Sequence, residues 1–274
     1  QRLIYGLFRS IYRNHRFGKL YCSWPDSKIK KFLSFADSIF FKYTGPVFCL
    51  TNRQKDYLES FLVKTAVQMW PPIPQNYFLT PVDNDNSKKI TITWVGRLDK
   101  GKGADLAFDI LEDFIGDTNY ELKVLAHTVN NKLSVPIPEF IKNQINCEVH
   151  EVSYSGFTAS LDEHVSKLLK STTIFICPYR LLSSTIDCPM LIQEAAAANC
   201  IIVSKNYPII ADIVGGDKYL IPSELDDKDI VSACLSKVHL AIKDIQNEKC
   251  RMMSHVQTLN FSSKEVSKHF LKNI

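Results

Sequence analysis

Hydrophobic runs alternate with amphipathic stretches along the later part of the chain. Short runs rich in β-branched residues occur at 90–96, 121–126, 147–152, 173–178, 200–204 and, more weakly, 218–222. Stretches with helical spacing lie between most of them, at 103–114, 161–170, 189–199 and 207–214. Apolar strands separated by helices are typical of a parallel sheet buried on both faces. The pattern predicts an α/β fold with a Rossmann-like, doubly wound parallel sheet.

The first 89 residues carry only part of such a pattern. Two helical stretches and two apolar runs predict about half of a second α/β domain, at 26–43, 52–61, 45–51 and 65–70. Prolines and then Asp, Asn and Ser follow at 70–89, which is typical of a linker. At the other end, 226–246 predicts a long helix, and the capping-box pair Ser262 and Glu265 predicts a last one. We therefore expect three parts: 1–89, 90–260 and 261–274.

Composition narrows the class of protein. Hydrophobic residues make up 45% and charged residues 23%, and no apolar run approaches the roughly 20 residues that span a bilayer. The eight cysteines are scattered, which favours reduced thiols in the cytoplasm and no zinc site. Residues 1–20 hold five Lys or Arg and no acid, and their apolar residues recur at helical spacing: Leu3, Ile4, Leu7, Phe8 and Ile11. They predict either a helix on an anionic membrane surface or an ordinary helix with a solvated basic face. No nucleic-acid partner is expected.

The stretch "WVGRLDKGKG" at 94–103 places two cations at the carboxyl end of a predicted strand. Ligands of such sheets bind beyond these strand ends. Arg97 and Lys102 are five residues apart, and an Arg fork with a Lys point charge suits a diphosphate. Taken alone, the stretch is equally compatible with an exposed basic turn.

A second stretch, "STIDCPMLIQEAAAANC" at 184–200, places one carboxylate on an apolar helix. Asp187 is an expected N-cap, Pro189 lies in the first turn, and Asn199 is suited to a left-handed stop. Free N–H groups of the first turn would then hold an anion. Glu194, about one and a half turns in, either accepts hydrogen bonds from a sugar or is ion-paired or capping within the fold.

Together the two stretches resemble the donor-binding domain of the retaining GT-B glycosyltransferases of family 4, the "glycosyl transferases group 1" family. The family pattern G-R-L-x-x-x-K-G is matched by Gly96, Arg97, Leu98, Lys102 and Gly103. Its second motif is matched by Pro178, Pro189, Glu194, Ala195 and Ala197. Residues 261–274 resemble the family's closing helix, which returns to the N-terminal domain. The resemblance covers roughly 45–274.

The resemblance implies a fold, a ligand and roles for particular residues. The ligand is a nucleotide sugar, bound by 90–260, while 1–89 would face the acceptor. Arg97 and Lys102 would hold its phosphates, and Glu194 its ribose. Backbone amides around Met190 and Leu191 would meet phosphate and sugar. No metal or cofactor is implied.

The chain departs from the family at the sugar-binding acid. Ile186 stands where the family has a first Glu, and Asp187 follows one step later. Either Asp187 substitutes after a one-residue shift or the contact to the sugar is lost. The first strands of the N-terminal domain, its glycine loop and its catalytic-region His have no counterpart either, and His15 in its basic helix is no substitute.

Two smaller features remain open. Asp83–Asp85 spell D-x-D, a metal–nucleotide signature of other glycosyltransferases, but they lie in the predicted linker and favour a polar turn. His127 ends a predicted strand, where it is either a donor contact or a loop or core histidine.

The leading hypothesis is an enzyme that moves a hexose from a nucleoside-diphosphate sugar to a saccharide or lipid-linked acceptor, with retention and without metal. We expect it in polysaccharide or glycolipid synthesis, in the cytoplasm or at the inner face of the membrane. The alternative is a catalytically inactive nucleotide-sugar-binding module or partner subunit. A GT-B epimerase or phosphorylase is a weaker third hypothesis.

Overall fold

The computed structural model describes residues 47–49, 55–56, 59, 66–78, 89–129, 135–154, 159–180, 189–247 and 262–272. Contacts divide the chain into two compact units, 1–69 with 273–274, and 70–272. In the smaller unit, β1 (Val47–Cys49) pairs in parallel with β2 (Ala66–Gln68). These strands lie within two of the predicted apolar runs. The predicted helix at 26–43 and the basic segment 1–20 lie outside the described residues.

The larger unit holds one parallel sheet of six strands in the order β5-β4-β3-β6-β7-β8. The strands are β3 (Ile90–Arg97), β4 (Tyr120–Val129), β5 (Cys147–Tyr154), β6 (Ile174–Cys177), β7 (Ile201–Lys205) and β8 (Leu220–Ile221). All adjacent pairs are parallel. Each of the six apolar runs thus forms a strand, and the predicted α/β class and doubly wound sheet are confirmed.

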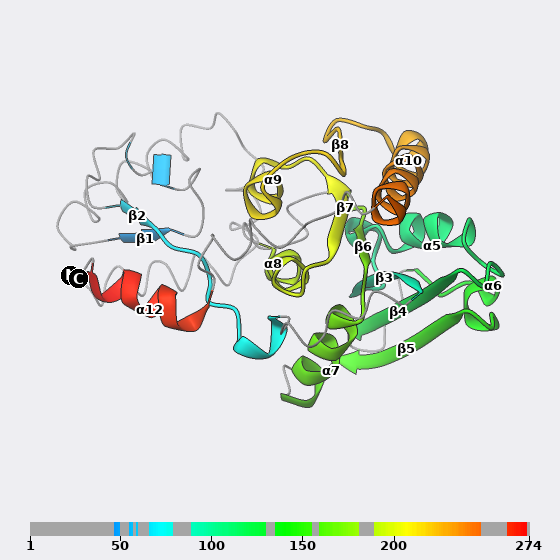
Figure 1. The fold of residues 1–274 in the computed structure, drawn as a ribbon, viewed down its shortest axis with the longest axis horizontal. Coiled ribbons are helices and arrows are strands. Elements are labelled where there is room, and N and C mark those ends of the chain that lie inside the picture. The colour runs from blue at the N-terminus through cyan, green and yellow to red at the C-terminus, as the bar shows by residue number, and fades with distance from the viewer. Residues whose placement is uncertain are drawn as a thin grey trace. The chain divides into compact units, whose positions relative to one another are not determined.

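Helices cover both faces of this sheet (Figure 1). One layer holds α7 (Ala159–Lys170), α8 (Met190–Ala197) and α9 (Pro208–Val214), with α8 in contact with the other two. The other layer holds α5 (Ala104–Glu112), α6 (Glu139–Lys142) and α10 (Asp227–Gln246), with α5 touching both neighbours. Right-handed crossovers explain the split, since the chain moves outward from β3 in one direction and from β6 in the other.

The strand order reverses between β3 and β6, which are direct neighbours. The chain leaves β3 toward β4 and leaves β6 toward β7, so the two following loops diverge. Ligands of doubly wound sheets bind in the crevice at this point, outside the carboxyl ends of the strands. The loops after β3 and β6 are therefore the first place to look for a site.

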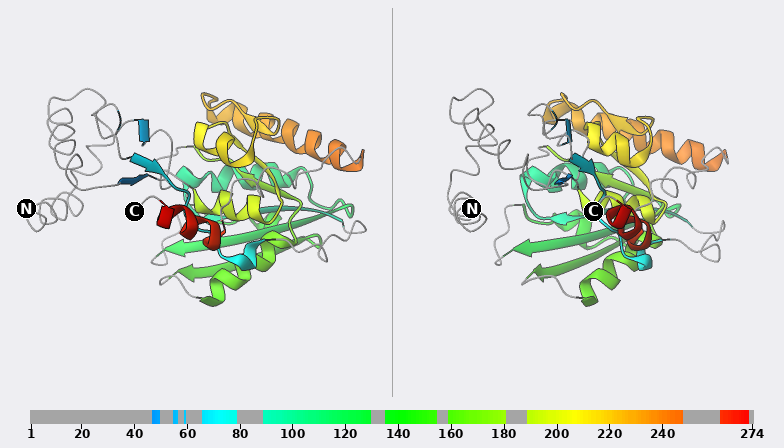
Figure 2. Two further views of the ribbon diagram at one scale, coloured as in Figure 1. Left: turned by 60° about the vertical axis from the view of Figure 1, so that its left-hand side comes forward. Right: turned by 90° about the vertical axis from the view of Figure 1, so that its left-hand side faces the viewer.

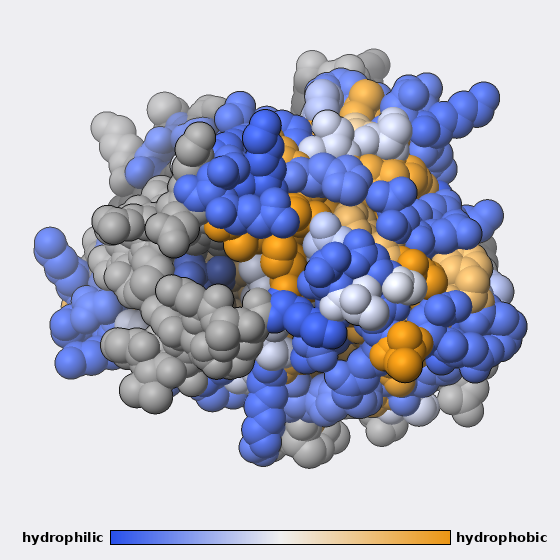
Figure 3. Space-filling model, turned by 45° about the vertical axis from the view of Figure 1, so that its right-hand side comes forward, coloured by the Kyte–Doolittle hydropathy of each residue, from blue (hydrophilic) through white to orange (hydrophobic). Residues whose placement is uncertain are grey.

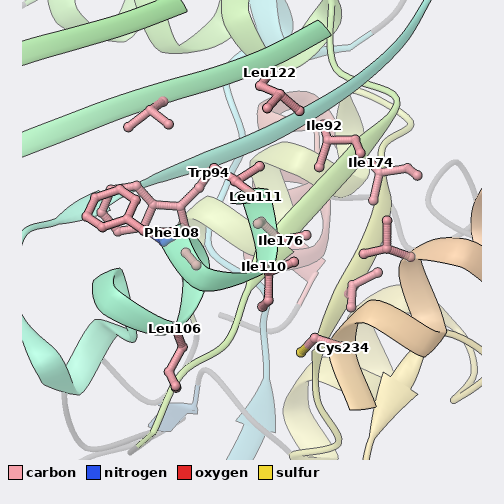
Figure 4. Packing of buried hydrophobic residues seen from close by; sticks show 14 of the residues in the cluster. Ile92, Trp94, Leu106, Phe108, Ile110, Leu111, Leu122, Ile174, Ile176 and Cys234 are labelled. Atoms are coloured by element: carbon pink, nitrogen blue, oxygen red, sulfur yellow. The ribbon is translucent and has the colours of Figure 1, made fainter. Parts of the chain in front are cut away.

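A hydrophobic core joins β3 to the helices of one layer (Figure 4). Trp94 on β3 is 1% exposed, and its ring lies edge-on to Phe108 of α5 with 5.5 Å between ring centroids. Ile176 of β6 and Cys234 of α10 belong to the same cluster. Burial of such side chains contributes roughly 1.5–3 kcal/mol each. This packing fixes where β3 ends and the next loop begins.

The segment before β3 packs onto the larger unit. Ile73 forms a bridge with Ser262, just before α12 (Ser263–Lys272), and the two segments lie side by side in both views of Figure 2. A short 3₁₀ helix, η1 (Gln75–Tyr77), follows, and Ile73 and Tyr77 are buried. The expected boundary lay after residue 89, whereas contacts divide the chain between 69 and 70, because these two side chains bury against the larger unit.

The capping box at the last helix is partly seen: the Glu265 N–H donates to Ser262 Oγ at 3.3 Å. Return of this helix to the N-terminal part stays a prediction.

The surface of the molecule is mixed in character. Figure 3 shows one face, where hydrophilic surface predominates and hydrophobic surface lies in patches between it. Within the described residues, no helix has the length and hydropathy needed to cross a membrane.

Candidate functional site

The loop after β3 is a tight turn held by an aspartate. Arg97 is the last residue of β3, and η3 (Lys100–Lys102) follows at once. Asp99 caps η3, because its Oδ1 accepts from the Lys102 N–H at 2.8 Å. Its other oxygen lies 3.1 Å from Nε of Arg97. Asp99 was not singled out from the sequence, and it is the residue that holds both expected cations in one turn.

Gly103 closes this turn against the loop after β6. Its φ of 69° is left-handed, a conformation that glycine adopts without strain. A Cβ placed on Gly103 would lie 2.1 Å from the carbonyl oxygen of Pro178. The two loops at the crevice therefore touch backbone to backbone, and no side chain fits between them.

Arg97 and Lys100 of this turn are exposed, whereas Lys102 is not. It is half-buried, and its Nζ lies 4.8 Å from the ring centre of Tyr179, which is itself buried. Burial, and secondarily the charge of Arg97, lower the pKa of Lys102 to about 8. The two cations of the loop therefore lie close enough to repel each other, and an anion between them would relieve that repulsion.

The N-cap of the helix after β6 lies two residues later than the expected cap, Asp187. Its N-cap is Pro189, in an extended conformation, so helical geometry starts at Met190 and Asp187 is not the N-cap. The N–H groups of Met190 and Leu191 lie in the first turn, where a helix offers them no acceptor. At the other end Asn199 has a φ of 63°, which confirms the left-handed stop.

Glu194 is half-buried on α8. Burial, and then the charge of Asp162 on α7, raise its pKa to about 7. The hydroxyl of Tyr77 donates to Asp162 Oδ1 at 2.6 Å. Glu194 makes no ion pair with any residue that the structure describes. The ion-paired interpretation of Glu194 therefore has no support in the described part of the chain.

Several residues named from the sequence are not placed. Asp187 and Ile186 lie outside the described residues, as do Asp83–Asp85 and His15. His127 is placed beside Arg97: the two are register partners on β4 and β3. Burial lowers the pKa of His127. Its position at the strand end is as expected, and a donor contact stays a prediction.

Sequence reasoning missed Tyr77, Asp162, Tyr179 and Arg180. Tyr179 and Arg180 directly follow Pro178 at a strand end, so the argument that selected Arg97 applies to them too. Tyr77 and Asp162 are 85 residues apart, and no local pattern links them. Within the described ranges, no three His, Cys, Asp or Glu side chains form a group suited to a metal ion.

These features define an α/β domain of the GT-B type, with cations and a helix N-terminus at its switch point. The chain belongs to the glycosyl transferases group 1 family, whose model matches residues 89–238, more than half of its length. No curated protein matches the sequence.

Solved structures show the same fold at low sequence identity. A glycosyltransferase from Rickettsia africae is 14% identical over 86% of this chain and 65% of its own, with a TM-score of 0.59. HepE from Anabaena, crystallised with UDP and glucose, is 11% identical over 84% and 63%, with a TM-score of 0.53. The pneumococcal O-GlcNAc transferase GtfA, crystallised with UDP and GlcNAc, is 16% identical over 82% of this chain and 44% of its own, with a TM-score of 0.54. The chain thus spans less than two thirds of each.

Proposed function

We propose that this chain binds a nucleoside-diphosphate sugar and transfers its hexose, with retention, to a saccharide or lipid-linked acceptor. One observation carries the proposal: at the switch point, Lys102 from the loop after β3 lies against Tyr179 from the loop after β6, with α8 and Glu194 following. Solved structures of the same fold hold UDP with a sugar. The nucleotide class of the ligand is inferred from this geometry and fold.

The chemistry follows from where negative charge develops. Cleavage of the bond between sugar and diphosphate leaves charge on the diphosphate oxygens. We propose that Arg97 and Lys102, with the N–H groups of Met190 and Leu191, stabilise that charge. In this proposal the cations replace a metal ion at the diphosphate.

Two further roles complete the donor site. Glu194 accepts hydrogen bonds from the two ribose hydroxyls, and its ionised form does so most strongly. Asp187 contacts the sugar in place of the acid missing at Ile186. The acceptor is proposed to face the N-terminal part of the chain.

We also propose that the enzyme works at the cytoplasmic face of a membrane in polysaccharide or glycolipid synthesis. The support is the basic segment 1–20, with five Lys or Arg and no acid. Co-sedimentation with vesicles tests this: binding is expected with anionic phospholipid and not with neutral phospholipid. Equal sedimentation with both would contradict it.

Release of nucleoside diphosphate tests the main proposal. The full chain is incubated with a panel of UDP- and GDP-sugars, with and without lipid-linked and saccharide acceptors, and free UDP or GDP is measured. Release from one donor supports transfer, and Arg97→Ala should abolish it. Binding of UDP or GDP without release from any donor would instead identify the inactive binding module. Failure to bind either nucleotide would overturn the donor site itself.

A further inference from the structure

Arg180 lies just beyond the end of β6, and its guanidinium is bonded to several acceptors of the protein. Its side chain is 17% exposed. Nη1 and Nη2 donate to the two carboxylate oxygens of Asp105 at 2.6 and 2.9 Å, and Nε donates to Asp227 at 2.7 Å. Such a two-pronged pairing fixes the guanidinium plane as well as its position.

The same residue holds the turn that carries Lys102. Nη1 of Arg180 also donates to the carbonyl oxygen of Lys100 at 2.7 Å. The backbone N–H of Arg180 donates to the carbonyl of Gly101 at 3.2 Å. Two consecutive carbonyls of η3 are therefore bound to one residue. The carbonyl oxygen of Arg180 in turn accepts a hydrogen bond from the hydroxyl of Tyr207 at 3.1 Å.

This network joins four loops at the carboxyl edge of the sheet. Asp105 opens α5 after β3, Arg180 follows β6, Tyr207 lies between β7 and α9, and Asp227 opens α10 after β8. Four of the five guanidinium N–H groups have acceptors within the protein: Nη1 donates two hydrogen bonds, and Nε and Nη2 donate one each. Arg180 is thus committed to the protein and has little capacity left for a ligand.

Resting on the proposed function, we propose that Arg180 is a positioning residue for the donor diphosphate. It clamps the Lys100–Lys102 turn against the loop after β6, and so keeps the ammonium of Lys102 above Tyr179. Arg180 acts through the turn and does not itself touch the donor.

Loss of Arg180 would act in two ways. The turn would lose the bond from Nη1 to its Lys100 carbonyl, and Lys102 would become more exposed. Asp105 would also be left without its partner. Burial opposes ionisation of that carboxyl, but the hydrogen bonds and charge of Arg180 bring its pKa below the usual value. Both changes weaken the hold on a diphosphate.

The test is UDP and GDP binding to the full chain by titration calorimetry between pH 6.5 and 9.5. In Arg180→Gln the Kd of the nucleotide that binds should rise about tenfold. The pH at which affinity falls should move upward from about 8, because Lys102 regains solvent. Arg180→Lys keeps the charge and satisfies fewer acceptors, so a smaller change of the same sign is expected.

Two further variants separate positioning from general stability. Asp105→Asn keeps the shape of its side chain and weakens the clamp, so it should raise both the Kd and the pH midpoint. Lys218→Met removes an ion pair of 2.7 Å with Asp244, away from the loops after β3 and β6. It should lower the melting temperature and leave the Kd unchanged.

The outcomes are distinct. If the unaltered chain binds neither nucleotide, the proposed function fails, and the role of Arg180 fails with it. If the unaltered chain binds and Arg180→Gln binds equally well with the same pH midpoint, the positioning role is overturned and the donor site stands. If Arg180→Gln does not fold, Arg180→Lys and Asp105→Asn decide: unchanged affinity and midpoint in both overturn the positioning role.

Discussion

The ammonium of Lys102 lies 4.8 Å from the ring centre of Tyr179. An aromatic face attracts a cation, whereas burial and the charge of Arg97 bring the pKa of Lys102 down to about 8. The charge of this lysine therefore changes close to neutral pH, unlike that of a solvated lysine.

Binding of a diphosphate should depend on the protonation of Lys102. Below pH 8 the ammonium is charged and attracts phosphate; above it the neutral amine does not, so affinity falls as the pH rises. Lys102→Arg keeps its charge to much higher pH. Above about pH 8, where Glu194 with its pKa of about 7 is already ionised, calorimetric titration with UDP or GDP should show affinity falling with pH for the parent and no such fall for the variant. The same fall in both would exclude Lys102 as its source.

Replacing Glu194 by Gln should stabilise the fold and weaken nucleotide binding. Its pKa is about 7 in the folded chain and near its usual 4.5 when unfolded. Between these values the folded state holds a proton that the unfolded state lacks, so the free energy of unfolding falls as the pH rises. Glu194→Gln avoids a buried charge. The variant should melt higher than the parent at pH 8, with no such gain at pH 4.

The same substitution should weaken nucleotide binding about tenfold, since a charge-assisted bond to ribose is lost. Glu112→Gln, at an exposed position of α5, is the matched control and should change neither property. Thermal melts across pH and calorimetry on both variants provide the measurement. Stabilisation of Glu194→Gln with unchanged affinity would mean that this carboxylate does not face the nucleotide.

Gly103→Ala should be strongly destabilising. A left-handed φ costs a non-glycine residue roughly 1–2 kcal/mol, and a Cβ here would also lie 2.1 Å from the carbonyl oxygen of Pro178. Gly116 provides the control: its φ is 79°, but no atom lies within 4 Å of a Cβ placed there. Urea unfolding should show a larger loss for Gly103→Ala than for Gly116→Ala. Equal losses would mean that the loop after β6 moves aside at no energetic cost when a Cβ is added at Gly103.

Tyr77→Phe should cost about 1 kcal/mol of stability, because it removes the 2.6 Å hydrogen bond to Asp162. Tyr120→Phe is the comparison, at a tyrosine whose ring packs edge-on against Phe114 with 5.2 Å between ring centroids. Chemical denaturation measures both. A loss no greater for Tyr77→Phe than for Tyr120→Phe would show that the hydroxyl bond does not hold η1.

Much of the fold could be predicted because periodicity reports burial directly. All six apolar runs of the larger unit are strands, since strands buried on both faces need unbroken apolar sequence. Boundaries were less accurate. β4 extends to Val129, beyond the apolar run, because its ladder with β5 continues as far as Tyr154. The end of a strand depends on how far its neighbour pairs with it, and the sequence of one strand alone does not reveal that pairing.

The site was predictable only in part, for the same reason. Arg97, Lys102 and Glu194 follow from strand ends and motif spacing. The clamp at Arg180 and the pairing of Tyr77 with Asp162 depend on segments far apart in the sequence. Likewise, Pro189 rather than Asp187 caps α8, since the extended backbone of Pro189 delays the helix start.

The contact between Gly103 and the carbonyl of Pro178 has a consequence for engineering. With no side chain between them, the backbones of the loops after β3 and β6 are in direct van der Waals contact. A loop transplanted after β3 from another member of the family must therefore follow the same backbone path against the loop after β6. Loop exchange intended to change ligand preference should replace both loops together.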